Sequence, residues 1–239
     1  ETKTDENGEF KVKFDAIPDK SISKDTLPVF NYFIYADVTD INGETRSSQT
    51  TVNVGYVALN LSVNIPEILY KDNGTAEFEI NSYNLDGEFV TAKGQIALHK
   101  LKNPNNYYRD RLWPKPLDHI LTEAEFHSKF KSDMYGDENN FYLWPKEEKV
   151  FDEKFDTGVS KKAVFNAISN VKSGKYILTI KSQDKFGKAV EIEKYLTITS
   201  KSDKTLPYPR LGWVNFTDTY VETGENLSFE VGSSAKDVN

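Results

Sequence analysis

An internal repeat constrains the fold of this chain more than any other feature of its sequence. Residues 30–43 and 174–187 each carry alternating large and small side chains that end in an Asp-x-x-Gly turn. A constant shift of 144 residues superposes the two turns, with Asp40 on Asp184. Alternation with a period of two predicts strands, and a short glycine-containing turn between two such strands is typical of a hairpin. Each copy is therefore predicted to be a β-hairpin.

A second, looser repeat indicates where the repeated units begin. Residues 76–82 (AEFEINS) are echoed by residues 227–233 (LSFEVGS), and each segment follows a glycine-containing turn. Together the two repeats predict an all-β fold built from tandem immunoglobulin-like sandwich modules. The predicted units are residues 1–55 (the C-terminal half of a sandwich), 56–200 (a complete sandwich) and 207–239 (the first strands of a following module). On this interpretation the sequence is a piece of a longer protein.

The central unit is longer than a sandwich requires, so we expect it to contain an insertion. An immunoglobulin-like sandwich needs about 100 residues, and the repeat period is 144. Residues 101–155 do not read as strands and are the predicted insertion. Thr122 and Glu125 have the spacing of a capping box, and hydrophobic residues then recur about one turn apart. A short amphipathic helix is therefore predicted near residues 122–132.

Composition excludes several classes of partner and chemistry. The net charge is −7 and no Lys/Arg cluster interrupts the acidic balance, which argues against nucleic acid as a partner and against an anionic membrane surface. The absence of cysteine excludes disulfides, thiolate metal sites and thiol nucleophiles in this sequence. No apolar run approaches the ~20 residues that a membrane-spanning helix needs.

Several motifs resemble those of a known family. The segment from Tyr35 to Ser47 (YADVTDINGETRS), continuing into residues 51–56, resembles a macroglobulin-like (MG) domain of the bacterial α2-macroglobulin family. Four further motifs resemble the neighbouring MG domain of that family, in particular of its Bacteroidetes-type members: YGDEN at 135–139, WP at 144–145, FDT at 155–157 and KFG at 185–187.

The resemblance implies a scaffold role rather than catalysis. It implies a protease-trapping inhibitor of the cell envelope, extracytoplasmic, in the periplasm or associated with the outer membrane, whose parent is lipid-anchored. The expected partners are neighbouring MG-like modules of the parent chain and, through the parent protein, proteases. Many members of the family carry a Cys-x-Glu-Gln thioester, and this sequence has no cysteine to form one.

No catalytic, cofactor-binding or metal-binding residue is predicted from the sequence. His99, His119 and His127 show no HExxH pattern and no carboxylate at ligand spacing, so they are interpreted as surface or partly buried residues. Asp40 lies in a segment that faintly suggests a calcium loop, but Val38 occupies a position that would need an oxygen ligand, and a hairpin turn is preferred. Asp133, Asp137 and Glu138 are interpreted as a solvated acidic loop. Neither a Gly-x-Ser-x-Gly elbow nor a phosphate-binding glycine loop is present.

The aromatic residues of the insertion support an alternative function. If exposed together, they would form a stacking platform for carbohydrate, as in an adhesion module of a surface protein. Large rings also supply packing where regular elements are lacking, and this interpretation is preferred. The residues concerned are Tyr107, Tyr108, Trp113, Tyr142 and Trp144.

The incomplete outer units lead to a further hypothesis. Residues 1–55 are expected to supply about three strands and residues 207–239 about two, and each set alone would leave an apolar face in water. We therefore expect the C-terminal strands to complete the N-terminal half-module, within one chain or between two chains in a strand-complemented dimer.

Overall fold

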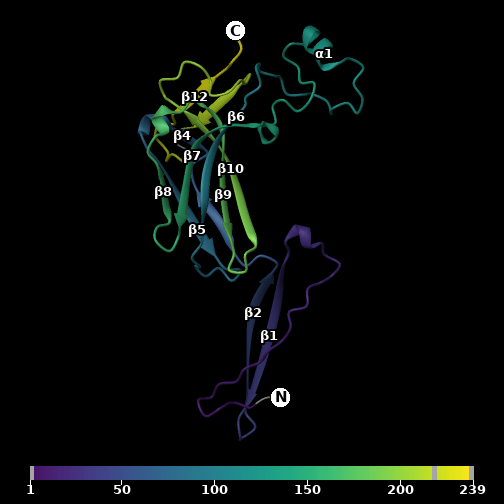
Figure 1. Ribbon diagram of the computed structural model, residues 1–239, viewed down its shortest axis with the longest axis vertical. Coiled ribbons are helices and arrows are strands. Elements are labelled where there is room, and N and C mark those ends of the chain that lie inside the picture. Colours follow the sequence, from purple (N-terminus) through teal and green to yellow (C-terminus); the bar gives the residue numbers. More distant parts are fainter. Residues whose placement is uncertain (1–2, 217–219, 237–239) are drawn as a thin grey trace.

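The computed structural model describes residues 3–216 and 220–236, and these residues form an all-β protein with one short α-helix (Figure 1). Within the described residues, no helix is long and apolar enough to cross a membrane. The centre of the molecule is a β-sandwich, and a separate two-stranded ribbon lies at each end of the chain. The predicted all-β sandwich fold is therefore confirmed.

Two mostly antiparallel sheets form the central sandwich. One sheet has the strand order β4-β10-β9-β6-β7 and the other has the order β3-β5-β8. All neighbouring pairs are antiparallel except β4 and β10, which run parallel. The strands are β3 (Asn60–Asn64), β4 (Ile68–Tyr70), β5 (Ala76–Tyr83), β6 (Lys93–Leu101), β7 (Lys146–Asp156), β8 (Lys162–Phe165), β9 (Gly174–Gln183) and β10 (Ala189–Thr199).

The core lies between these two sheets because alternate side chains of each strand point inward. On β5, Phe78 and Ile80 are fully buried, while Glu77 and Glu79, which alternate with them, are exposed. They pack against a facing layer that includes Ile96 and Leu178, and Phe78 contacts Phe151 edge to face at 5.6 Å. All of the buried apolar residues among the described positions fall between Leu59 and Tyr208.

Strand β7 corrects the predicted extent of the insertion. Residues 146–155 were expected to be irregular, but they form an edge strand paired with β6, and the insertion is confined to residues 102–145. The first part of β7 is charged and exposed on both faces, and only Phe151 and Phe155 are buried. Register shifts against β6 next to His99 also break the pairing. An edge strand with this composition shows no period-two alternation.

The N-terminal ribbon is a long hairpin of β1 (Val29–Thr39) and β2 (Thr45–Gly55). It contributes two strands rather than the expected three, because residues 3–28 contain no strand and only one short 3-10 helix, η1 (Lys24–Thr26). Figure 1 shows the hairpin projecting away from the sandwich. No described residue before Leu59 is buried.

The C-terminal ribbon consists of β11 (Trp213–Phe216) and β12 (Phe229–Gly232). These are the two strands that were expected from residues 207–239. In the part of the chain that the structure describes, β1 and β2 pair only with each other, and so do β11 and β12. The two ribbons lie at opposite ends of the molecule (Figure 1). Strand complementation within one chain is therefore wrong, and complementation between two chains stays a prediction.

One type of turn recurs along the chain and closes two of its hairpins, β1–β2 and β9–β10. Within the described residues, four five-residue turns share one pattern. The amide of the turn's first residue donates to the carbonyl of its fifth residue, and the fourth residue is a glycine with positive φ. In each turn the first side chain accepts hydrogen bonds from the amides of positions three and five. The hairpin interpretation of the turns that begin at Asp40 and Asp184 is confirmed. The other two turns begin at Asp5 and Asn84.

Candidate functional site

The insertion forms a separate lobe, residues 102–145, beside one end of the sandwich (Figure 1). It contains helix α1 (Glu123–Lys129) and the 3-10 helix η3 (Phe141–Leu143); two other 3-10 helices, η2 (Lys71–Asn73) and η4 (Ile168–Asn170), lie in the sandwich. The lobe is attached at its base, where the amide of Lys102 donates to the carbonyl of Pro145 at 2.9 Å.

Helix α1 begins at the predicted capping box. The Thr122 hydroxyl accepts from the amide of Glu125, and the Glu125 carboxylate accepts from the amide of Thr122 at 2.9 Å. These two hydrogen bonds satisfy amides that a helix start otherwise leaves free. The Glu125 carboxylate also accepts from the Thr122 hydroxyl, and the bonds from the Thr122 amide and hydroxyl hold the pKa of the Glu125 carboxyl below its usual range. The helix ends at Lys129, three residues earlier than predicted. Its orientation directs His127 toward the loop at residues 133–140.

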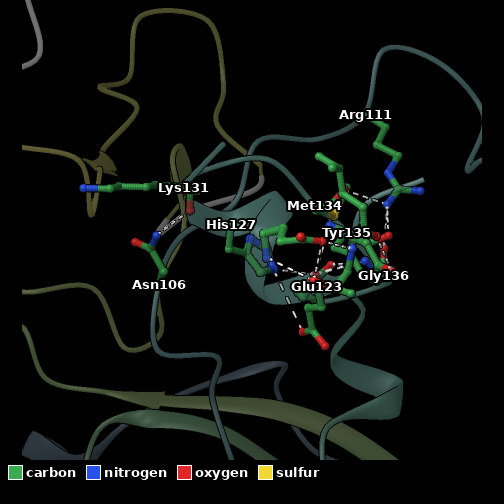
Figure 2. A network of polar contacts seen from close by, with 12 residues as sticks. Asn106, Arg111, Glu123, His127, Lys131, Met134, Tyr135 and Gly136 are labelled. Carbon is green, nitrogen blue, oxygen red and sulfur yellow. Dashed lines mark hydrogen bonds and ion pairs between the residues drawn. The ribbon is translucent and has the colours of Figure 1, made fainter. Parts of the chain in front are cut away.

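His127 lies between two carboxylates. Its Nε2 atom is 3.4 Å from Oε1 of Glu138 and 4.0 Å from Oε1 of Glu123. In Figure 2 the His127 ring and the Glu123 carboxylate lie together beside the backbone of Tyr135 and Gly136. Both ring nitrogens of His127 are inaccessible to solvent and have no hydrogen-bond partner. In the described ranges this is the one group of three His, Cys, Asp or Glu side chains whose potential ligand atoms converge.

Glu138 is held in place by the backbone of the loop. Its Oε1 accepts from the amides of Tyr135 and Gly136, each at 3.0 Å, and its Oε2 accepts from the amide of Gly136 at 2.9 Å. Arg111 clamps the same loop from the other side by donating to three successive carbonyls, those of Met134, Tyr135 and Gly136 (Figure 2). The Glu138 carboxylate is therefore held in one orientation by the backbone of its own loop.

A second set of contacts fixes the strand-like segment that carries Arg111. The Asn106 side chain donates to the carbonyl of Lys131 at 2.7 Å, and the amide of Arg109 donates to the carbonyl of Ser132. The ring of Tyr108 lies 5.4 Å from that of His127. Burial raises the pKa of Tyr108, and the nearby carboxylates of Glu138 and Glu123 raise it further.

The sequence analysis interpreted Asp133, Asp137 and Glu138 as a solvated acidic loop. In the structure each of these carboxylates faces a basic side chain. Asp133 pairs with Arg109 at 2.7 Å, and Asp137 pairs with Lys115 at 2.6 Å, which lowers the pKa of the Asp137 carboxyl. Glu138 instead faces His127. The statement that no carboxylate lies at ligand spacing from the histidines is therefore wrong for His127, because Glu123 precedes it by four residues on the same helix face.

The other two histidines stand apart from this cluster. The ring of His119 stacks on Tyr135, with centroids 3.9 Å apart. His99 lies on β6, where burial lowers its pKa and Lys146 and Lys149 lower it further.

The aromatic residues of the lobe do not form one platform. Trp144 anchors the lobe: its indole N–H donates to the carbonyl of Glu138, and its ring meets Tyr208 edge to face at 5.8 Å. Tyr142 packs on Tyr195 of β10. Trp113, by contrast, is 69% exposed and lines a pocket of about 330 Å³ together with Phe126 and other residues of the lobe.

Comparison with known proteins adds no assignment to this geometry. No family model matches the chain, and no curated protein matches it.

Proposed function

We propose that this chain is a non-catalytic scaffold segment of an α2-macroglobulin-like, protease-trapping inhibitor of the bacterial cell envelope. The proposal starts from the MG-like motifs in the sequence. The observation that supports it best is the arrangement of one complete sandwich with a two-stranded β-ribbon at each end.

The apolar side chains of the two ribbons favour modules that pack against neighbours. On β1, Phe33 is 63% exposed and Tyr35 is 71% exposed, and on β12 both Phe229 and Val231 are exposed. An isolated two-stranded hairpin is marginally stable in water, so it gains stability when further strands or another domain cover it. Such contacts between modules are what a scaffold built from tandem domains requires.

Fixed contacts between ribbon and sandwich support the same proposal. The Asn53 amide donates to Asp86 and its side chain donates to the carbonyl of Leu85, both at 3.2 Å. At the other end, the Tyr70 hydroxyl donates to Glu230 of β12 at 3.1 Å. These contacts set the direction in which each ribbon leaves the sandwich.

The test is protease trapping by the full protein that carries this chain. A trapped protease is shielded from large substrates but still reaches small ones, so we expect loss of activity on a protein substrate and retention of activity on a short peptide. The double substitution Phe33→Thr and Tyr35→Thr should weaken trapping, because it removes two large exposed apolar side chains from β1. Val159→Thr changes an exposed apolar residue of the sandwich and serves as the control. An unchanged activity on the protein substrate would rule the proposal out.

The alternative is a carbohydrate-binding or adhesion module, and exposed Trp113 beside its pocket is the observation that favours it. Aromatic rings with one face in solvent suit stacking on sugars. Screening of the chain against glycans tests this alternative directly: binding that Trp113→Ala abolishes and Tyr142→Ala retains would support it. Absence of glycan binding would leave the scaffold proposal as the better account.

A further inference from the structure

We infer that Glu123, His127 and Glu138 form a binding site for a divalent transition-metal cation, for which Zn²⁺ is the best match. The inference concerns the lobe and does not depend on the proposed scaffold function. It rests on the distances among the three side chains, on the unsatisfied nitrogens of His127 and on the preorganised carboxylate of Glu138.

The shortest of the distances fits tetrahedral coordination, and all three potential ligand atoms lie within 4.8 Å of one another. Zinc binds histidine nitrogen and carboxylate oxygen at about 2.0–2.2 Å, which places two ligand atoms roughly 3.3 Å apart across a tetrahedral edge. The 3.4 Å separation between His127 Nε2 and Glu138 Oε1 matches this edge. The 4.0 Å separation from Glu123 Oε1 is longer, but the Glu123 side chain is 69% exposed and is free to close it.

The donor set favours a transition metal. One imidazole nitrogen and two carboxylate oxygens suit zinc, whereas calcium and magnesium take oxygen ligands almost entirely. Polar atoms buried without a partner are uncommon in proteins, and each calls for an explanation. A cation bound to Nε2 and to the Glu138 carboxylate 3.4 Å away supplies one for that nitrogen, which is inaccessible to solvent and has no hydrogen-bond partner.

The surrounding residues already hold the ligands in position. The capping box at Thr122 fixes the helix that carries Glu123 and His127, and the amides of Tyr135 and Gly136 orient the Glu138 carboxylate. Outer contacts of this kind determine the affinity of metal sites. A bound cation would join α1 to the loop at residues 133–140, and three protein ligands would leave a fourth position for water.

The experiment is calorimetric titration of the full chain, freed of metal by a chelator, with zinc chloride. We expect one zinc ion per chain and a rise in Tm of about 4 °C or more at saturating zinc. Calcium and magnesium chloride should have no effect. Glu123→Ala and His127→Ala should each weaken binding by about tenfold or more, because each removes a ligand.

A folding check and a matched control variant separate loss of a metal ligand from loss of structure. Glu123 is exposed and alanine favours helix, so Glu123→Ala should fold normally, and far-ultraviolet circular dichroism checks this for each variant. His119→Ala is the matched control, since His119 lies in the same lobe but outside the cluster, and it should retain zinc binding. Absence of zinc binding, or binding that survives both Glu123→Ala and His127→Ala, would overturn the inference.

Discussion

Asp184 joins the turn between β9 and β10 to the segment between β2 and β3, through the two oxygens of one carboxylate. Its Oδ1 accepts from the amides of Phe186 and Lys188 and so closes the turn between β9 and β10. Its Oδ2 accepts from the amide of Ala58 at 3.0 Å, where the chain passes from β2 into the sandwich. Asp184 is buried, so the fold depends on both oxygens remaining acceptors.

The substitution Asp184→Asn should therefore lower the free energy of unfolding by about 1–3 kcal/mol, because the new amide group cannot accept from the partly buried amide of Ala58. Asparagine still closes the turn, as Asn84 does in the equivalent turn between β5 and β6. Asp40→Asn is the matched control, since Asp40 closes an exposed turn and should tolerate the change. Urea denaturation measures both variants, and equal losses would contradict this account.

The same carboxylate should make stability depend on acid pH. Burial raises the pKa of Asp184, but hydrogen bonds from Ala58, Lys188 and Phe186 outweigh it, and the pKa lies below its usual value. The ionised form therefore stabilises the fold at neutral pH, and this contribution is lost as the pH falls below about 4. The difference in stability between the native chain and Asp184→Asn should shrink on acidification. A constant difference from pH 7 to pH 3 would show that the charge is not responsible.

Tyr176 is a second residue whose polar atom is buried in the sandwich. It lies near the start of β9, is fully buried, and its hydroxyl donates to the carbonyl of Lys172 four residues upstream. Burial raises the pKa of its hydroxyl strongly. The arrangement is similar to the tyrosine corner of immunoglobulin-like sandwiches.

Removing this hydroxyl should destabilise the sandwich. Tyr176→Phe removes the hydrogen bond to the carbonyl of Lys172, with an expected loss of about 0.5–1.5 kcal/mol. Tyr32, the counterpart of Tyr176 in the repeat, donates to the carbonyl of Ile17 from the hairpin instead. Tyr32→Phe should therefore leave the denaturation midpoint of the sandwich unchanged. If the two variants unfold alike, the hydroxyl of Tyr176 has no special role.

Helix α1 depends on its cap more than most helices do. It has seven residues, none of them buried, while isolated helices below about 12–15 residues are marginal in water. Thr122→Ala should cost about 1 kcal/mol of helix stability and speed amide exchange in residues 123–129 by about fivefold. Ser128→Ala removes a hydroxyl from the same helix away from the cap and should not speed exchange. Equal exchange in both variants would show that the tertiary contacts, not the cap, hold α1.

The elements that sequence predicts well are those whose signal is local. An alternating strand followed by a glycine-containing turn predicts a hairpin, and the spacing of Thr122 and Glu125 predicts α1. The turn at Asn84 carries the same signal as that at Asp184, and it could have been recognised by allowing Asn at the first position. Strand β7 could not, since an exposed edge strand needs no apolar alternation: its partner β6 specifies it.

The cluster of Glu123, His127 and Glu138 could be predicted from the sequence only in part, because only part of its signal is local. Glu123 and His127 lie four residues apart, which places them on one face of a predicted helix. Glu138 lies in a loop, and its position depends on amides of Tyr135 and Gly136 that no spacing rule predicts. Arg111 adds a contact across more than twenty residues of sequence.

At the scale of the whole molecule, the sandwich should not depend on the N-terminal hairpin for its stability. Every buried apolar residue of the described chain lies at or after Leu59, and the hairpin touches the sandwich mainly through Asn53 and the segment that follows it. Two hydrogen bonds of this kind contribute about 0.5–1.5 kcal/mol each. The apolar area buried between the two sheets is far larger, and it sets the free energy of unfolding.

A chain that begins at Tyr56 should therefore unfold cooperatively, with a free energy of unfolding within about 3 kcal/mol of that of the full chain. Urea denaturation followed by tryptophan fluorescence measures this cleanly, because Trp113, Trp144 and Trp213 all lie outside the removed segment. The separate peptide 1–55 should show no cooperative transition, since a two-stranded hairpin without cover is marginal. A shortened chain that fails to fold would mean that β1 and β2 stabilise the sandwich through more than the contacts at Asn53. In that case the hairpin would belong to the sandwich and would not be free to pair with a neighbouring module.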